Sequence, residues 1–354
     1  MSFRKRERPN ASSQPLPRGV RPSAANGVPV TSSGCMSLDT VLSGHGGMPV
    51  GSGLVIEENG TTDFSSVLLR YFAVEGLLQG QNLWIGGGVG EHWVRDLPAA
   101  TDVVAEDETS NKRLEERMKI AWRYSSLGDF GSGLRAQNRP LPSNNNNADS
   151  PKDPYCHAYD LTKRMITTTM ADQLHYSPPC SGSGDPFTPL LASLVQTIQK
   201  TTGIIRCVLP GVLSPAVYPP SASQSKYLVK FANNLRAILR AHPSRLLVMM
   251  SMPLDLYPRE TSSTTWVELL MDGIIELTPL PPNPADRDGP QGLLKIHKVP
   301  LLERLSMEAD LSFKVTRKRF SIEAWSLPAL GEEEPREGGG TLKDVKPTNI
   351  DISF

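Results

Sequence analysis

The sequence predicts an α/β fold in which helices cover both faces of a mostly parallel sheet, with antiparallel strands at one edge. Short apolar runs alternate with longer segments of helical periodicity between residues 54 and 277. Such alternation supplies the crossover helices that parallel strands need. The last two strand-like runs, residues 292–298 and 313–325, have no helical segment between them. We therefore expect these two runs to pair antiparallel at the edge.

The first half of the predicted domain contains a short helix and then a strand–turn–helix unit. We expect a helix over residues 37–42, capped by Ser37, and a strand over residues 54–57. The strand breaks at Asn59-Gly60, and a helix over residues 63–79 follows from its apolar spacing: Phe64, Val67, Leu68, Tyr71, Phe72 and Leu78. A strand over residues 82–85 ends in a glycine run at residues 86–90. The run predicts a loop with no helix directly after it, and close approach of a ligand is the alternative.

The second half continues the same alternation. Predicted helices cover residues 106–124, 185–201, 227–241 and 266–271. Predicted strands cover residues 204–209, 245–252, 273–277, 292–298 and 313–325.

We expect one large domain, residues 31–327, between two polar tails. Residues 1–30 form a basic tail rich in Pro, Ser and Arg, which we expect to be disordered, with weak nucleic-acid contact or nuclear targeting as alternatives. Residues 125–154 include an asparagine run at 144–147 and predict a disordered insertion. Residues 328–354 predict a polar C-terminal tail.

Composition excludes several classes of protein. The 354 residues carry no net charge, and the four cysteines are far apart with no C-x-x-C pair, so no metal site and no disulfide framework is predicted. No secretory signal opens the chain, and no apolar run approaches the ~20 residues of a membrane span. We expect a soluble protein inside the cell with no membrane contact.

The strand-to-helix turn at residues 58–63 lies where a phosphate-binding loop would be. It consists of Glu58, Asn59, Gly60, Thr61, Thr62 and Asp63. A Walker A loop, G-x-x-x-x-G-K-[ST], needs its lysine to neutralise the phosphates, and this chain has no Gly-Lys pair. Asp63 lies near the place of that lysine and would repel a triphosphate. We therefore expect a degenerate phosphate loop and no catalytic residue.

Other polar residues have a structural and a chemical interpretation. His157 lies beside Cys156 and Asp160, but no third and fourth metal ligand is evident, so packing or an interface is favoured over catalysis. For His297 a structural or edge role is favoured. Glu57 and Glu58 could orient a water or a ribose, and a solvated or interface role is favoured over that.

Four cations near the C-terminus are the candidate RNA-binding residues. They are Lys314, Arg317, Lys318 and Arg319. On a single strand, Arg317 and Arg319 would face one side, and the two lysines the other. Such a stripe would suit phosphates, whereas the alternative is an edge strand protected by charge. The loop around Lys226 is a weaker addition.

The order of elements resembles the RecA-like ATPase core. Residues 34–39, residues 42–44 and Gly51 precede the first core strand as they do in that superfamily. In active members the strand equivalent to residues 204–209 ends in an acidic residue that holds Mg²⁺, whereas here Pro210-Gly211 follow. The resemblance therefore implies the fold without either half of the ATP chemistry.

Longer strings resemble the family of Elongator complex subunit 4. The most specific are MKIAWRY at residues 118–124 and YCHAYDLTK at residues 155–163. Residues 54–75, 292–298 and 313–320 agree as well, and the resemblance covers roughly residues 31 to 327.

The resemblance implies a place in an assembly. In that family, RecA-like subunits 4, 5 and 6, two copies of each, form a hexameric ring. The ring joins the catalytic core of Elongator, which modifies the wobble uridine of certain tRNAs at carbon 5. It is described as binding tRNA in a nucleotide-dependent way and helping its release.

We therefore expect a non-catalytic ring subunit, present in the cytoplasm and the nucleus, that supports assembly and tRNA handling. The implied partners are subunits 5 and 6, the catalytic core and tRNA. We expect no cofactor and no metal, with ATP possible only at ring interfaces. The alternatives are an active RecA- or KaiC-type NTPase and a pure scaffold without RNA contact.

Overall fold

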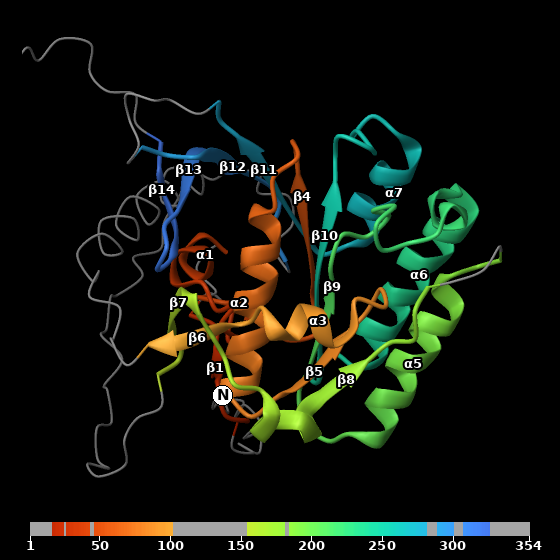
Figure 1. Cartoon of the computed structure of the whole chain (residues 1–354), viewed down its shortest axis with the longest axis horizontal. Helices are drawn as coiled ribbons and strands as arrows, with labels where there is room; N and C mark the ends of the chain where they lie inside the picture. The colour runs from red at the N-terminus through yellow and green to blue at the C-terminus, as the bar shows by residue number, and fades with distance from the viewer. Residues whose placement is uncertain are drawn as a thin grey trace, which may run out of the picture.

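A computed structural model describes residues 16–24, 26–42, 46–101, 154–180, 184–281, 289–300 and 307–325. A twisted sheet crosses the middle of the molecule, with helices on either side (Figure 1). The predicted helix at residues 106–124 and the predicted tail at residues 328–354 lie outside the described residues, as does the predicted insertion apart from Pro154. Among the described residues, no helix has the length and apolar composition of a membrane span.

The sheet has nine strands in the described part of the chain. Their spatial order is β14 (Phe320–Ala324), β13 (Met307–Val315), β12 (Gly292–Lys298), β11 (Gly273–Pro279), β4 (Gly53–Glu58), β10 (Leu246–Pro253), β9 (Ile205–Leu209), β5 (Asn82–Ile85) and β8 (Leu174–Tyr176). Neighbours from β11 to β8 are parallel, and those from β11 to β14 are antiparallel. The predicted α/β class, mostly parallel with an antiparallel edge, is confirmed.

The predicted strand over residues 313–325 is wrong, because the chain reverses inside it. β13 and β14 pair antiparallel and are joined by a tight turn at residues 316–319. Thr316 holds the turn: its backbone N–H donates to the Arg319 carbonyl (2.8 Å), and its hydroxyl accepts from the N–H of Arg319 (3.1 Å). A threonine side chain that bonds nearby backbone in this way stabilises a turn without glycine.

Helices cover both faces of the sheet. One face carries α1 (Met36–Val41), α2 (Phe64–Leu78) and α3 (Gly90–Arg95), and the other carries α5 (Phe187–Lys200), α6 (Ser225–Ala241) and α7 (Ser262–Leu270). Side chains alternate along β4, so Leu54 and Ile56 join the α2 core while Val55 joins the α6 core. The same alternation sends Glu57 and Glu58, at the end of β4, to opposite faces.

Several boundaries differ from the prediction. Ser37 is not a cap: α1 begins after Cys35, and the Ser37 hydroxyl accepts the N–H of Ile322 on β14 (3.1 Å). α3 follows the glycine run directly, although no helix was expected there. α7 begins at Ser262 rather than residue 266, because the Thr261 side chain caps it by accepting the N–H of Thr264.

Order begins earlier than residue 31. β1 (Val20–Pro22), β2 (Pro29–Thr31) and β3 (Met48–Pro49) form a small antiparallel sheet, so residues 16–24 and 26–30 are not part of a disordered tail. A second small sheet, also not predicted, pairs β6 (Pro98–Thr101) with β7 (Ala158–Arg164). Two 3₁₀ segments, η1 (Thr168–Gln173) and η2 (Pro220–Ser223), complete the described elements.

Candidate functional site

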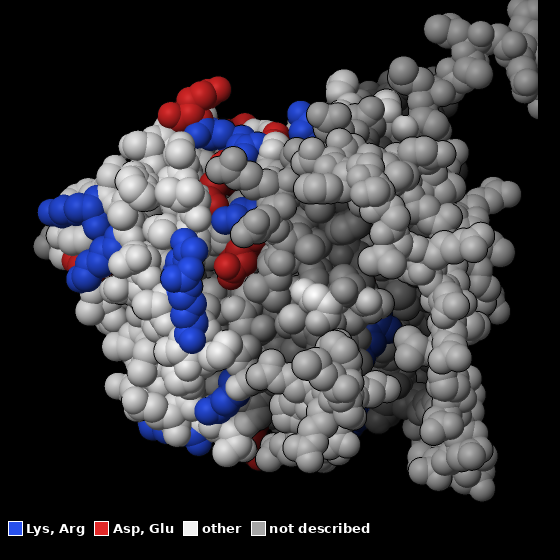
Figure 2. All heavy atoms as spheres, turned by 180° about the vertical axis from the view of Figure 1, so that it is seen from behind, with Lys and Arg blue, Asp and Glu red and all other residues white. Residues whose placement is uncertain are grey.

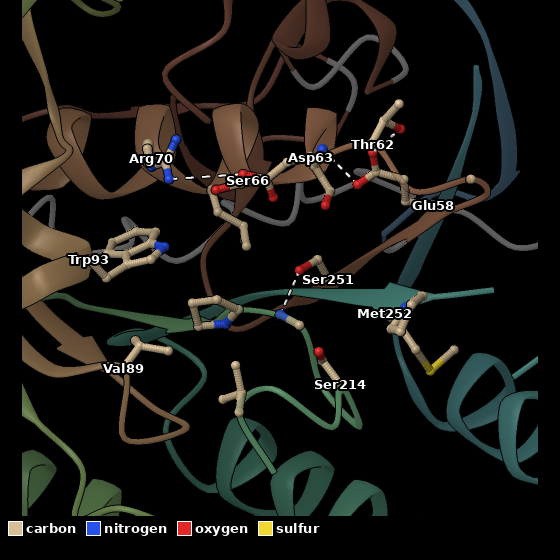
Figure 3. Close-up of a pocket in the computed structure, with 17 residues that line it drawn as sticks. Glu58, Thr62, Asp63, Ser66, Arg70, Val89, Trp93, Ser214, Ser251 and Met252 are labelled. Carbon is tan, nitrogen blue, oxygen red and sulfur yellow. Dashed lines mark hydrogen bonds and ion pairs between the residues drawn. The ribbon is translucent and has the colours of Figure 1, made fainter. Parts of the chain in front are cut away.

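A cleft opens where the parallel strands β4, β9 and β10 end. It has a volume of about 310 Å³, and its walls come from the end of β4 and the turn after it, from α2 and α3, from the segment that follows β9, and from the last residues of β10. Figure 3 shows side chains that line it, among them Glu58, Thr62, Asp63, Ser66, Arg70, Val89, Trp93, Ser214, Ser251 and Met252. The carboxyl ends of parallel strands are where α/β proteins bind ligands. The cleft therefore lies where the sequence predicted a degenerate phosphate loop.

Glu58 fills the place that a phosphate would take. One oxygen of its carboxylate accepts the Phe64 N–H (2.8 Å) and the Thr62 hydroxyl (2.7 Å), and the other accepts the Ser65 N–H (3.0 Å). Phe64 and Ser65 are the first residues of α2, whose free N–H groups and positive dipole end favour an anion. The anion bound at this helix terminus is a side chain of the protein itself.

The rest of the loop fixes the turn and leaves Asp63 outside it. Asn59 Nδ2 donates to Glu276 on β11 (2.7 Å), which anchors the start of the turn. Gly60 has φ +86°, and a Cβ there would come within 2.8 Å of Pro279, so this position requires glycine. Asp63 precedes α2 without capping it through its side chain, which is 76% exposed and lies 4.0 Å from Arg70. Thr61 is exposed.

Glu57 is buried on the opposite face of the sheet. Among the residues that the structure describes, neither of its carboxyl oxygens has a hydrogen-bond partner, and Arg259 lies 3.7 Å away. Arg259 also pairs with Glu268 (2.8 Å) and Glu276 (3.3 Å). Burial, together with the charge of Glu268, raises the pKa of Glu57 to about 8. Of the expected solvated or interface role, the solvated alternative is wrong for Glu57 and Glu58, since both side chains are buried, and the interface alternative stays a prediction.

His297 belongs to the same charged cluster. Its Nε2 lies 2.7 Å from Glu276 Oε2, and this hydrogen bond is the main reason that the pKa of Glu276 falls to about 2. The contact agrees with the structural role favoured for His297.

His157 holds its loop against α2. Its backbone N–H and its Nδ1 both lie 3.0 Å from the carboxylate of Glu75, a fully buried residue of α2 that also accepts the Tyr159 hydroxyl. These contacts with Glu75 support a packing role for His157 over a catalytic one.

Arg206 is a buried residue of β9. It donates hydrogen bonds to Gln81, Thr31 and two backbone carbonyls.

The four candidate RNA-binding cations do not form a two-sided stripe. Lys314 lies on β13 and is half-buried, whereas Arg317, Lys318 and Arg319 are exposed in the β13–β14 turn. The pKa of Asp160 on β7 is lowered mainly by its hydrogen bonds to Thr162, and the charges of Lys163 and Lys318 add to that effect. The structure brings three of the four cations together, at a turn rather than along a strand.

A second group of cations lies on the outer helices. α5 and α6 contain no Asp or Glu, and α6 carries Lys226, Lys230, Arg236 and Arg240. Lys230 pairs with Asp185 (2.8 Å) just before α5. In Figure 2, Lys and Arg side chains are spread over the side of the molecule that carries these helices. Lys226, the weaker candidate from the sequence, is one of these α6 cations.

Two further residues that line the cleft, Arg70 and Trp93, were not predicted from the sequence. Arg70 lies on α2, in a run of otherwise mainly apolar residues, and this isolated charge was the available signal. Trp93 lies on α3, the helix that was not predicted, so no pattern pointed to it.

Comparison with known proteins places the whole chain in one family. The model of the PAXNEB protein family matches residues 12–354. Elongator complex protein 4 of Schizosaccharomyces pombe is 34% identical, with 99% of this chain and 96% of that protein covered. Elongator complex protein 4 of Homo sapiens is 29% identical over 88% of this chain and 79% of the human protein. A KaiC-like protein of Pyrococcus horikoshii OT3 is similar in structure, with a TM-score of 0.44, 14% identity, and 83% and 99% of the two chains covered.

Proposed function

Because this chain belongs to the Elongator complex protein 4 family, the PAXNEB family, we propose that it is a non-catalytic RecA-like subunit of the accessory ring of Elongator. Its role is assembly of the ring together with tRNA binding and release during carbon-5 modification of the wobble uridine.

The Glu58 carboxylate at the start of α2 carries the non-catalytic part of this proposal. A triphosphate entering the cleft would have to displace a carboxylate that accepts three hydrogen bonds, or bind against its charge. Hydrogen bonds to a charged group contribute roughly 1.5–3 kcal/mol each, so displacement costs several kcal/mol. At about 1.4 kcal/mol per tenfold in affinity, ATP binding would weaken by at least two orders of magnitude.

An active NTPase is the rival function, and it gives the opposite result in a direct assay. The purified full chain would be titrated with Mg-ATP and tested for phosphate release. We expect neither binding at micromolar concentrations nor turnover above background. Turnover that disappears on Thr62→Ala or Asp63→Ala would establish the rival.

Apolar side chains on α7 support the assembly role. Trp266 and Leu269 are 47% and 59% exposed and lie three residues apart, hence on one face of the helix. Exposed tryptophan and leucine on one face are typical of a surface that another protein covers. We expect the chain to be poorly soluble alone and to be rescued by co-expression with subunits 5 and 6. A stable monomer that ignores both subunits in size-exclusion runs would contradict the proposal.

The cations of the β13–β14 turn support the tRNA part. Arg317 and Lys318 are exposed at the tip, and each phosphate that they neutralise adds about 0.7–0.9 to the slope of log affinity against log salt. Replacing both with Ala in the intact ring should weaken tRNA binding and flatten that slope equally for different tRNAs. Arg95→Ala, at an exposed arginine paired with Glu91, is the matched control. If the affinity and the salt slope are both unchanged, this turn does not contact tRNA, and the result favours a scaffold without RNA contact.

A further inference from the structure

Two hydrogen-bond donors on residues that line the cleft have no acceptor in the described part of the chain. Arg70 Nε and Trp93 Nε1 are buried, and neither has a partner among the described residues. Trp93 is 8% exposed, and the indole nitrogen faces the middle of the cavity in Figure 3. Buried N–H groups without acceptors are rare because each costs free energy. Both residues line the same cavity, so a ligand that enters it lies beside both.

The geometry of Arg70 defines the kind of acceptor. Its Nη2 lies 4.0 Å from Asp63 Oδ2, beyond hydrogen-bond distance, and its Nε has no partner, so the structure shows no hydrogen bond from this edge of the guanidinium to a described residue. This edge presents two parallel N–H groups, the arrangement that binds both oxygens of a carboxylate. The Trp93 N–H adds a third donor.

We propose that the inner end of this cleft binds a carboxylate carried on a small apolar group, through the guanidinium edge of Arg70 and the indole N–H of Trp93. Leu69, Val89 and Val217 supply apolar walls for the body of the ligand. A volume of about 310 Å³ is at the lower end of ligand pockets, which suits a small acid.

Charge favours a single carboxylate over a polyphosphate. Glu58 and Asp63 line the other end of the cleft and would repel a group carrying two or more negative charges. A single carboxylate is neutralised by pairing with Arg70, so Glu58 and Asp63 repel it only weakly. The same chemistry can come from a free small acid or from an Asp or Glu side chain of a neighbouring subunit.

Benzoate is the probe, and Trp93 itself is the reporter. The full chain would be labelled with 5-fluorotryptophan, reconstituted with its partner subunits and observed by ¹⁹F NMR. Trp93→Phe assigns the reporter among the five tryptophans. We expect benzoate, but not the neutral benzamide, to shift the Trp93 signal. Arg70→Met should weaken benzoate binding at least about tenfold, whereas Arg95→Met, at an exposed arginine, should leave it unchanged.

The assembled complex and the full chain alone, kept soluble by a fusion tag, distinguish the two sources of the carboxylate. Benzoate binding in the complex indicates a free acid. Benzoate binding only to the chain alone indicates that a neighbouring subunit's carboxylate fills the site. Absence of binding in both samples would overturn the proposal, as would equal binding of benzamide or an Arg70→Met variant that binds benzoate normally. Assembly is measured separately, so failure of this site is distinguishable from failure of the ring.

Discussion

Replacing Glu58 with Ala removes the anion that the start of α2 binds. The change leaves the N–H groups of Phe64 and Ser65 and the Thr62 hydroxyl without their acceptor. Losing an N-terminal cap costs about 0.5–2 kcal/mol, and stranding hydrogen bonds to a charge adds to that loss. We expect the free energy of unfolding to fall by roughly 2–4 kcal/mol in Glu58→Ala. Glu58→Gln keeps one acceptor oxygen and should lose about half as much.

Urea unfolding of the assembled complex, followed by a probe in this chain, measures the effect. Glu91→Ala is the matched control, because Glu91 is an exposed glutamate whose ion pair with Arg95, at 3.8 Å, lies on the surface, and surface pairs contribute little. A Glu58→Ala variant as stable as Glu91→Ala would refute the assignment of Glu58 as the internal anion of α2.

Three further predictions concern buried charges and the insertion. Glu57→Gln should make stability less dependent on pH. The pKa of Glu57 is about 8 in the folded state and 4.5 ordinarily, so between these values the native state binds a proton that the unfolded state does not. The stability of the wild type therefore falls as pH rises from about 4.5 to 8. Urea midpoints at pH 5.5 and 8 would test this, and equal pH dependence of the two proteins would contradict it. Arg206→Met should destabilise the fold by at least about 3 kcal/mol, because it leaves the buried acceptors Gln81, Thr31 and two backbone carbonyls without this donor, at about 1–3 kcal/mol for each group left unsatisfied; a thermal melt close to wild type would contradict this. Deleting residues 131–150, where the sequence predicts a disordered insertion, should leave the melting temperature nearly unchanged, and a large loss of stability would mean that the segment packs.

The regular core of the fold was predictable because its signals are local. Apolar spacing located α2, α5 and α6, and continuous apolar runs located β9 and β10 within a few residues. The helices are long enough for their apolar spacing to be clear, and the strands are buried on both faces, so their sequences are mostly apolar throughout.

Short elements that depend on distant partners were not predictable. β1 and β2 have three residues each, β1 pairs with β2, and β2 pairs with β3, so no periodicity marks them. The turn at residues 316–319 has no Gly, Asn or Asp, and its Thr316 hydrogen bonds replace the usual turn residues.

The sequence located the candidate site but not its chemistry. Residues 58–63 were expected to be a phosphate loop without its lysine, and they do connect β4 to α2. The role of Glu58 depends on a hydrogen bond to a helix N–H seven residues later, which no spacing rule describes. Likewise, Arg70 and Trp93 come from different helices and meet only in the folded chain.

The central claim is that an internal carboxylate, rather than a nucleotide phosphate, occupies the start of α2. The most direct measurement is photolabelling with 8-azido-ATP in the assembled complex, followed by mapping of labelled peptides in this chain, for wild type and Glu58→Ala. We expect no ATP-competable label around residues 58–66 in the wild type, and label to appear there only when Glu58 is removed. Strong, ATP-competable labelling of the wild type that Glu58→Ala weakens would contradict the account.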